Sequence, residues 1–120
     1  MTGHARYTLS IKSEKKPLAS VERMDSWWAK GIGVLGRRSL PAGEGVWLTG
    51  AASVHTCFVA FPLDILFLDR DLHVMSVQPG VPPWRALVSC PGAVHTIELG
   101  AGTLAKGLVR VGDTVLLTPK

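Results

Sequence analysis

The chain has 120 residues, of which 47% are hydrophobic and 18% charged, together with 13 glycines and 8 prolines. This length fits one domain over residues 1–120 and excludes two catalytic domains, and the composition excludes a disordered chain. The formal net charge of +4 is concentrated at the start, because residues 1–38 hold eight basic and three acidic side chains whereas residues 39–120 hold five and six.

The first half of the chain predicts two strands and a short helix. Residues 6–12 alternate polar and apolar side chains, which is the period of a half-buried strand. A charged connection follows, and a capping Asp-Ser pair ahead of apolar residues at helical spacing predicts a short helix over 25–35. Turn residues over 40–45 then lead into a strand over 46–48.

The second half predicts short strands separated by turns. The apolar run over 65–68 does not alternate with polar residues, so we expect this strand to be buried on both faces. Three prolines within 78–83 remove backbone donors, which predicts a loop rather than a central strand. The remaining elements are strands over 54–61, 73–77, 94–99 and 109–117, a hairpin turn over 69–72 and one helical turn over 103–106.

These elements predict a mainly β domain. Seven or eight short strands with one or two short helices fit a single small β-sandwich or a barrel. A doubly wound α/β fold is excluded because it needs long helices between successive strands.

The sequence also predicts a cytoplasmic protein without a membrane segment. Its first 16 residues lack the apolar stretch of a signal peptide, and no segment approaches 18 consecutive apolar residues. Cys57 and Cys90 are too few for the disulfide framework of a small secreted scaffold, and we interpret them as buried thiols.

Patterns that could bind a cofactor or a metal lack the context that such sites need. Residues 31–36 match the glycine spacing of dinucleotide-binding loops, but no strand precedes them and no acid follows at the distance that the ribose requires. His55, Cys57, Cys90 and His95 form a nominal zinc set whose spacing matches no known finger. We therefore expect no cofactor and no metal.

Single charges in apolar surroundings are the candidate site residues. Asp64 and Glu98 each lie within an apolar run, and a buried carboxylate must find hydrogen bonds or a cation, or take up a proton. One interpretation is structural, with Asp64 accepting backbone hydrogen bonds and Glu98 pairing with Arg85. The other is a ligand pocket formed by His55, Asp64, Trp84, Arg85 and Glu98.

The leading prediction is a small, non-enzymatic β module that binds a small ligand or a protein partner, because every complete catalytic set is missing. One alternative is a hydrolase or transferase in which Asp64 or Glu98 is the general base and His55 or Arg85 steadies developing charge. A second alternative is a polyanion- or nucleic-acid-binding protein that uses the basic residues of 1–38. The second alternative is disfavoured because those basic residues are not interleaved with aromatics.

Five segments carry a family resemblance: GVLGRRSLPAGEG at 33–45, SVHTCFVAFPLDILFLD at 53–69, PWR at 83–85, ELGAG at 98–102 and VGD at 111–113. In this order and spacing they resemble the prokaryotic family called domain of unknown function 192, over about residues 20–118. The resemblance implies a small mainly β fold of jelly-roll or sandwich type and no established activity. Family members carry Asp-Gly where this chain has Asp71-Leu72. The polar positions that this chain retains are His55, Thr56, Asp64, Glu98 and Asp113.

Overall fold

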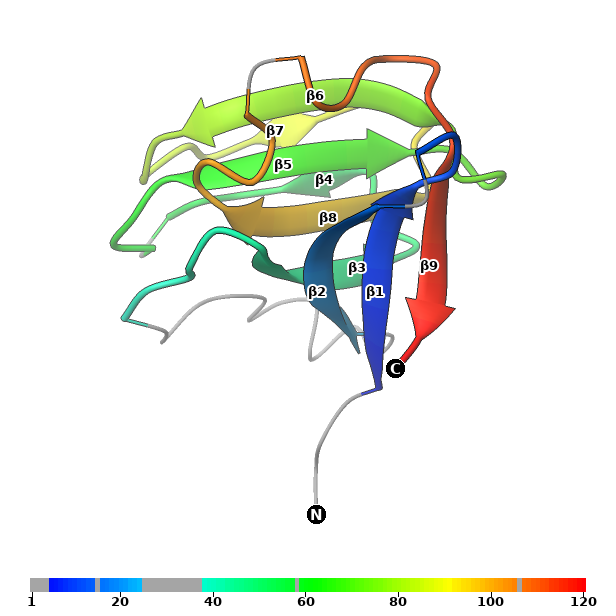
Figure 1. The fold of residues 1–120 in the computed structure, drawn as a ribbon. Helices are drawn as coiled ribbons and strands as arrows, with labels where there is room; N and C mark the ends of the chain where they lie inside the picture. Colours follow the sequence, from blue (N-terminus) through cyan, green and yellow to red (C-terminus); the bar gives the residue numbers. More distant parts are fainter. Residues whose placement is uncertain (1–4, 15, 25–37, 58, 106) are drawn as a thin grey trace.

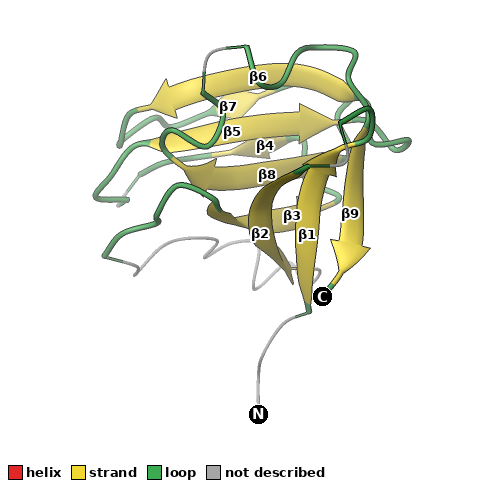
Figure 2. Ribbon diagram, viewed as in Figure 1, coloured by secondary structure: helices red, strands yellow, loops and turns green. Residues whose placement is uncertain are grey.

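The computed structural model describes residues 5–14, 16–24, 38–57, 59–105 and 107–120, which form strands and loops but no helix (Figure 2). The strands are β1 (Arg6–Ile11), β2 (Pro17–Met24), β3 (Glu44–Thr49), β4 (Ser53–Val54), β5 (Leu63–Leu68), β6 (Val74–Val81), β7 (Val88–Ser89), β8 (His95–Gly100) and β9 (Val115–Pro119). Within the described ranges, no helix is long and apolar enough to cross a membrane.

Seven strands form one strongly curled sheet in the order β6-β5-β8-β3-β2-β1-β9 (Figure 1). Neighbouring strands are antiparallel except β2 and β3, which are parallel. The two edge strands meet at one end, where His73 and Thr114 form a bridge and the Val74 N–H donates to the Asp113 carbonyl at 2.7 Å. The sheet is therefore a half-barrel, and β4 and β7 form a separate two-stranded sheet.

The half-barrel is packed on both faces. An inner cluster takes side chains from all seven strands, including Trp47 of β3 and Leu66 of β5. An outer cluster on the opposite face includes Val46 and Ile65, and the segments around β4 and β7 pack against it. All six residues of β5 are buried, which confirms the prediction that the run over 65–68 is buried on both faces.

The structure confirms a mainly β domain and corrects several predicted elements. Residues 17–24 were predicted to be a connection but form β2, because Arg23 on the inner face and Met24 on the outer face obscure the alternation of polar and apolar residues. Residues 78–81 extend β6 instead of forming a loop; β6 is an edge strand, where Pro79 is tolerated.

The predicted helices, the jelly-roll arrangement and the sandwich are not confirmed. Residues 103–105 form no helix, and the helix predicted over 25–35 lies outside the described residues, as does the glycine pattern over 31–36. Of the strand predicted over 54–61, only the β4 residue Val54 is in a strand in the described part. One curled sheet holds seven of the nine strands, so the fold is a half-barrel with a small additional sheet.

Candidate functional site

Asp64 is buried near the start of β5, with 1% of its surface exposed. Its Oδ1 accepts a hydrogen bond from the Gly80 N–H at 2.8 Å, and its Oδ2 accepts from the N–H groups of Gly102 at 3.0 Å and Leu104 at 2.8 Å. Gly80 and Gly102 have φ angles of 63° and 95°, a region that favours glycine. The carboxylate therefore ties the end of β6 and the turn after β8 to β5, which is the structural role considered from the sequence.

Glu98 is buried in the middle of β8, with 3% exposed, between Val46 of β3 and Ile65 of β5. Burial raises the pKa of its carboxyl to about 7, because desolvation disfavours the charged form. Among the described residues, none donates a hydrogen bond to its Oε1. Arg85, the partner considered from the sequence, is exposed to solvent instead.

Asp64 and Glu98 point to opposite faces of the half-barrel. In the pairing of β5 with β8, Asp64 lies opposite Leu99 of the inner cluster, whereas Glu98 lies opposite Ile65 of the outer cluster. Successive side chains on a strand alternate between faces, so this register separates the two carboxylates. They cannot act together in one site, as a catalytic pair or as part of a single pocket.

Two hollows lie near the turn that follows β8. One of about 400 Å³ is lined by Asp64, Pro79, Gly80 and the turn over 101–105. The other, of about 360 Å³, lies between the turn joining β1 to β2, residues 42–43 and residues 102–108. Neither hollow is lined by any of the other four candidate residues.

Thr56, the residue after His55, is hydrogen-bonded to the segment that holds Trp84 and Arg85. The Thr56 N–H donates to the Arg85 carbonyl at 2.9 Å, and the Thr56 carbonyl accepts from the Trp84 N–H at 2.9 Å. The Thr56 hydroxyl donates to the Pro82 carbonyl at 2.7 Å and accepts from the Arg85 N–H at 2.8 Å. Thr56 is fully buried, so four shielded hydrogen bonds fix residues 82–85 against it.

The side chains around this link are exposed. His55, which follows β4 in the chain, is exposed to solvent. Trp84 is 62% exposed, Leu87 is 69% exposed, and Arg85 is also exposed. We call His55, Trp84, Arg85 and Leu87 the Trp84 surface.

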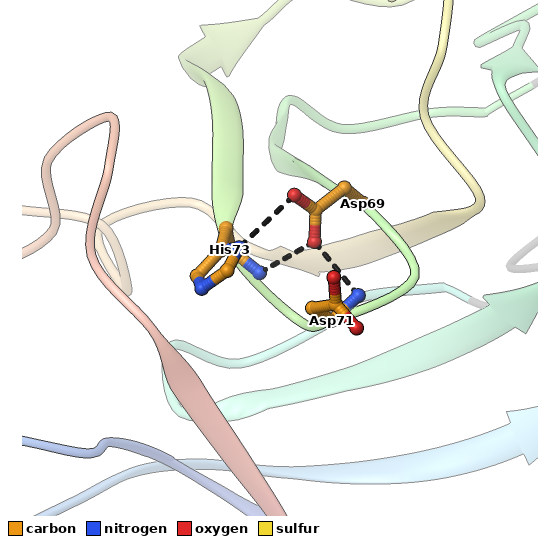
Figure 3. A network of polar contacts seen from close by, with 3 residues as sticks. All are labelled: Asp69, Asp71 and His73. Carbon is orange, nitrogen blue, oxygen red and sulfur yellow. Dashed lines mark hydrogen bonds and ion pairs between the residues drawn. The ribbon is translucent and has the colours of Figure 1, made fainter.

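Asp69, Asp71 and His73 form a compact polar group in the turn between β5 and β6 (Figure 3). Asp69 Oδ1 accepts hydrogen bonds from the N–H groups of Asp71 at 2.8 Å and His73 at 2.9 Å, and Asp69 Oδ2 lies 3.1 Å from His73 Nδ1. The bond from the His73 N–H is the main cause that lowers the pKa of Asp69. Within the described ranges, no other group of three potential metal ligands is this compact, so the nominal zinc set is not assembled. These hydrogen bonds close the hairpin between β5 and β6, which gives the group a structural role.

Two basic residues of the first third already have partners within the protein. The Arg23 guanidinium lies 4.8 Å from the ring centre of Trp47, and Trp47 Nε1 donates to His95 Nδ1 at 3.1 Å. An Arg6 nitrogen lies 3.8 Å from a Glu22 oxygen. Lys15, Lys30 and Arg37 lie outside the described residues.

One family profile matches residues 8–117, nearly the whole half-barrel: DUF192, described as an uncharacterized ACR. The chain belongs to the DUF192 family. This confirms the resemblance found in the sequence, and it assigns no activity. No curated protein matches this DUF192 chain.

Two solved structures share the fold of this DUF192 chain. A proposed transcription regulator from Sinorhizobium meliloti 1021 has 20% identity and a TM-score of 0.84, and the match covers 98% of this chain and 97% of that one. A protein of unknown function from Novosphingobium aromaticivorans DSM 12444 has 21% identity and a TM-score of 0.76, with 92% and 83% covered. At these identities the likeness establishes the fold alone.

Sequence reasoning misses two residues of the Trp84 surface region, Thr56 and Leu87. Thr56 belongs to the polar positions of the DUF192 resemblance, but its bonds to residues 82–85 span more than 25 positions and no local pattern reveals them. No motif or periodic pattern in the sequence singles out Leu87. In the structure it is 69% exposed.

Proposed function

We propose that this DUF192 chain is a protein-binding module whose partner docks on the Trp84 surface. The observation that carries the proposal is a large aromatic side chain, 62% exposed, on a backbone fixed by a buried threonine. Tryptophan and arginine are the residue types that dominate binding energy at protein interfaces. A surface that is already rigid also loses less conformational entropy when a partner binds.

The backbone at Trp84 supports this proposal. Its φ angle of 66° lies in the left-handed region, which costs roughly 1–2 kcal/mol for a residue with a Cβ. Strained backbone conformations of this kind cluster at binding sites, where the surrounding structure holds them in place. Thr56 supplies that restraint here.

A protein partner fits the Trp84 surface better than a small ligand does. Small-molecule sites are concave and enclose their ligands, whereas Trp84 and Leu87 each expose more than half of their surface. The two hollows near the turn after β8 are lined by other residues. Binding of a small ligand and a cytoplasmic location both stay predictions from the sequence.

The test is photo-crosslinking in cells of the source organism from a benzoylphenylalanine placed at Leu87. Val111, which is 67% exposed, is the matched control position because its exposure equals that of Leu87 within a few per cent. We expect a discrete protein adduct from position 87 that position 111 does not give and that Trp84→Ala removes. The identified protein, purified, should bind the wild-type chain at least about thirty-fold more tightly than Trp84→Ala, as expected for a hot-spot residue. Equal adducts from the two positions, or adducts that survive Trp84→Ala, would refute the proposal.

A further inference from the structure

The Trp84 surface carries positive charge and no acidic side chain from its own segments. The exposed Arg85 supplies this charge through its guanidinium. Residues 50–63 and 79–97, which hold the surface, contain no aspartate or glutamate. The acids that flank these segments in the sequence, Asp64 and Glu98, are buried within the half-barrel and do not reach the surface.

The apolar part of the surface lies beside this charge. Trp84 directly precedes Arg85 in the chain and Leu87 follows it by two residues, and both residues are exposed. The bonds from Thr56 hold the backbone of Trp84 and Arg85 in one geometry. A partner therefore meets the side chains of Trp84 and Arg85 on a backbone that is held in place, with the exposed Leu87 two residues further along the chain.

This composition fits a peptide segment better than a nucleic acid. Nucleic-acid binding draws most of its affinity from several lysine and arginine contacts to phosphates. The segments that form the Trp84 surface contain one arginine and no lysine. A carboxylate, in contrast, matches the fork of a single guanidinium with two parallel hydrogen bonds.

We propose that the partner segment is an acidic peptide: an aspartate or glutamate pairs with Arg85, and a neighbouring apolar side chain packs on Trp84 and Leu87. This inference rests on the proposed function and adds the chemistry of the partner to it.

The experiment selects random twelve-residue peptides displayed on phage against the wild-type chain, with Trp84→Ala as the counter-selection. We expect the surviving peptides to be enriched in aspartate or glutamate next to an aromatic or aliphatic residue. Arg85→Gln should weaken synthetic versions of them roughly three- to ten-fold, and higher salt should weaken them further. Arg110→Gln, which removes an exposed arginine from a different loop, should leave the affinity unchanged.

The outcomes separate this inference from the proposed function. Peptides that require Trp84 but carry no acidic residue, or that are indifferent to Arg85→Gln, overturn the acidic partner and leave protein binding standing. The inference is overturned in favour of nucleic acid if a twenty-nucleotide oligothymidine binds more tightly than every selected peptide and its binding requires Trp84. Selection that yields no Trp84-dependent peptide overturns the inference as well, and the crosslinking from position 87 then decides the proposed function by itself.

Discussion

Replacing Glu98 by glutamine should remove a large part of the pH dependence of this protein's stability. The pKa of the buried carboxyl rises from 4.5 to about 7 in the folded state. Between these values the folded protein holds a proton on Glu98 that the unfolded chain has released, so unfolding releases a proton and becomes easier as the pH rises. The contribution of Glu98 is thus most favourable below pH 4.5 and is lost by about pH 7.

The size of the effect follows from the pKa shift. One pKa unit corresponds to about 1.4 kcal/mol, so the shift of Glu98 corresponds to about 3 kcal/mol of unfolding free energy between its two limits. This is a large share of the roughly 5–15 kcal/mol that stabilises a typical domain. Glutamine resembles the protonated acid in shape and cannot ionise. Glu98→Gln should therefore match the wild type near pH 4.5 and exceed it by about 3 kcal/mol near pH 8.

The assay is urea unfolding followed by tryptophan fluorescence at several values between about pH 4.5 and pH 8. Trp47, which is 7% exposed within the inner cluster, provides a probe of the core. The matched control is Glu44→Gln, because Glu44 is an exposed glutamate of the neighbouring strand β3. It should leave the pH profile of stability unchanged. Parallel profiles for the wild type and Glu98→Gln would refute the argument from burial.

Three further changes test the other contacts. Asp64→Asn should lower the unfolding free energy by about 3 kcal/mol in urea titrations, because an amide cannot accept all three backbone N–H groups, whereas Asp71→Asn should change it by less than about 0.5 kcal/mol. Thr56→Val should cost about 2 kcal/mol and speed trypsin cleavage after Arg85, measured by mass spectrometry, since its hydroxyl makes two of the four bonds to residues 82–85. At position 84, glycine should be more stable than alanine by about 1 kcal/mol, because φ is 66°; the reverse order in thermal unfolding would contradict the assigned backbone.

The strands whose apolar residues are continuous or clearly alternating are predictable from the sequence. β1, β5 and β8 show these patterns, and their sequence-based bounds agree with the structure within about one residue at most ends. β2 escapes prediction because Arg23 sits on its inner face, where its guanidinium stacks on Trp47 from another strand. The contact with Trp47 stabilises the inward-facing Arg23, but Trp47 lies on another strand, so no local sequence pattern reveals the contact.

The candidate site, like the strands, is only partly predictable from the sequence. That Asp64 and Glu98 are buried in apolar strands follows from their neighbours in the sequence. Their separation onto opposite faces depends on the register between β5 and β8, which pairs Asp64 with Leu99 and Ile65 with Glu98. A shift of one residue would have brought different side chains to each face, and single-sequence patterns do not determine that register.

Two non-glycine residues, Leu72 and Trp84, have left-handed backbones, and their side chains differ in exposure. Leu72 has a φ of 65°, and its N–H donates to the Asp69 carbonyl in the hairpin turn. Its side chain packs against the inner cluster, so this leucine stabilises the fold. Trp84 has a φ of 66°, and most of its side chain is exposed. A glycine would meet the same backbone requirement with less strain. The left-handed backbone at this exposed tryptophan is consistent with the proposal that Trp84 contacts a partner.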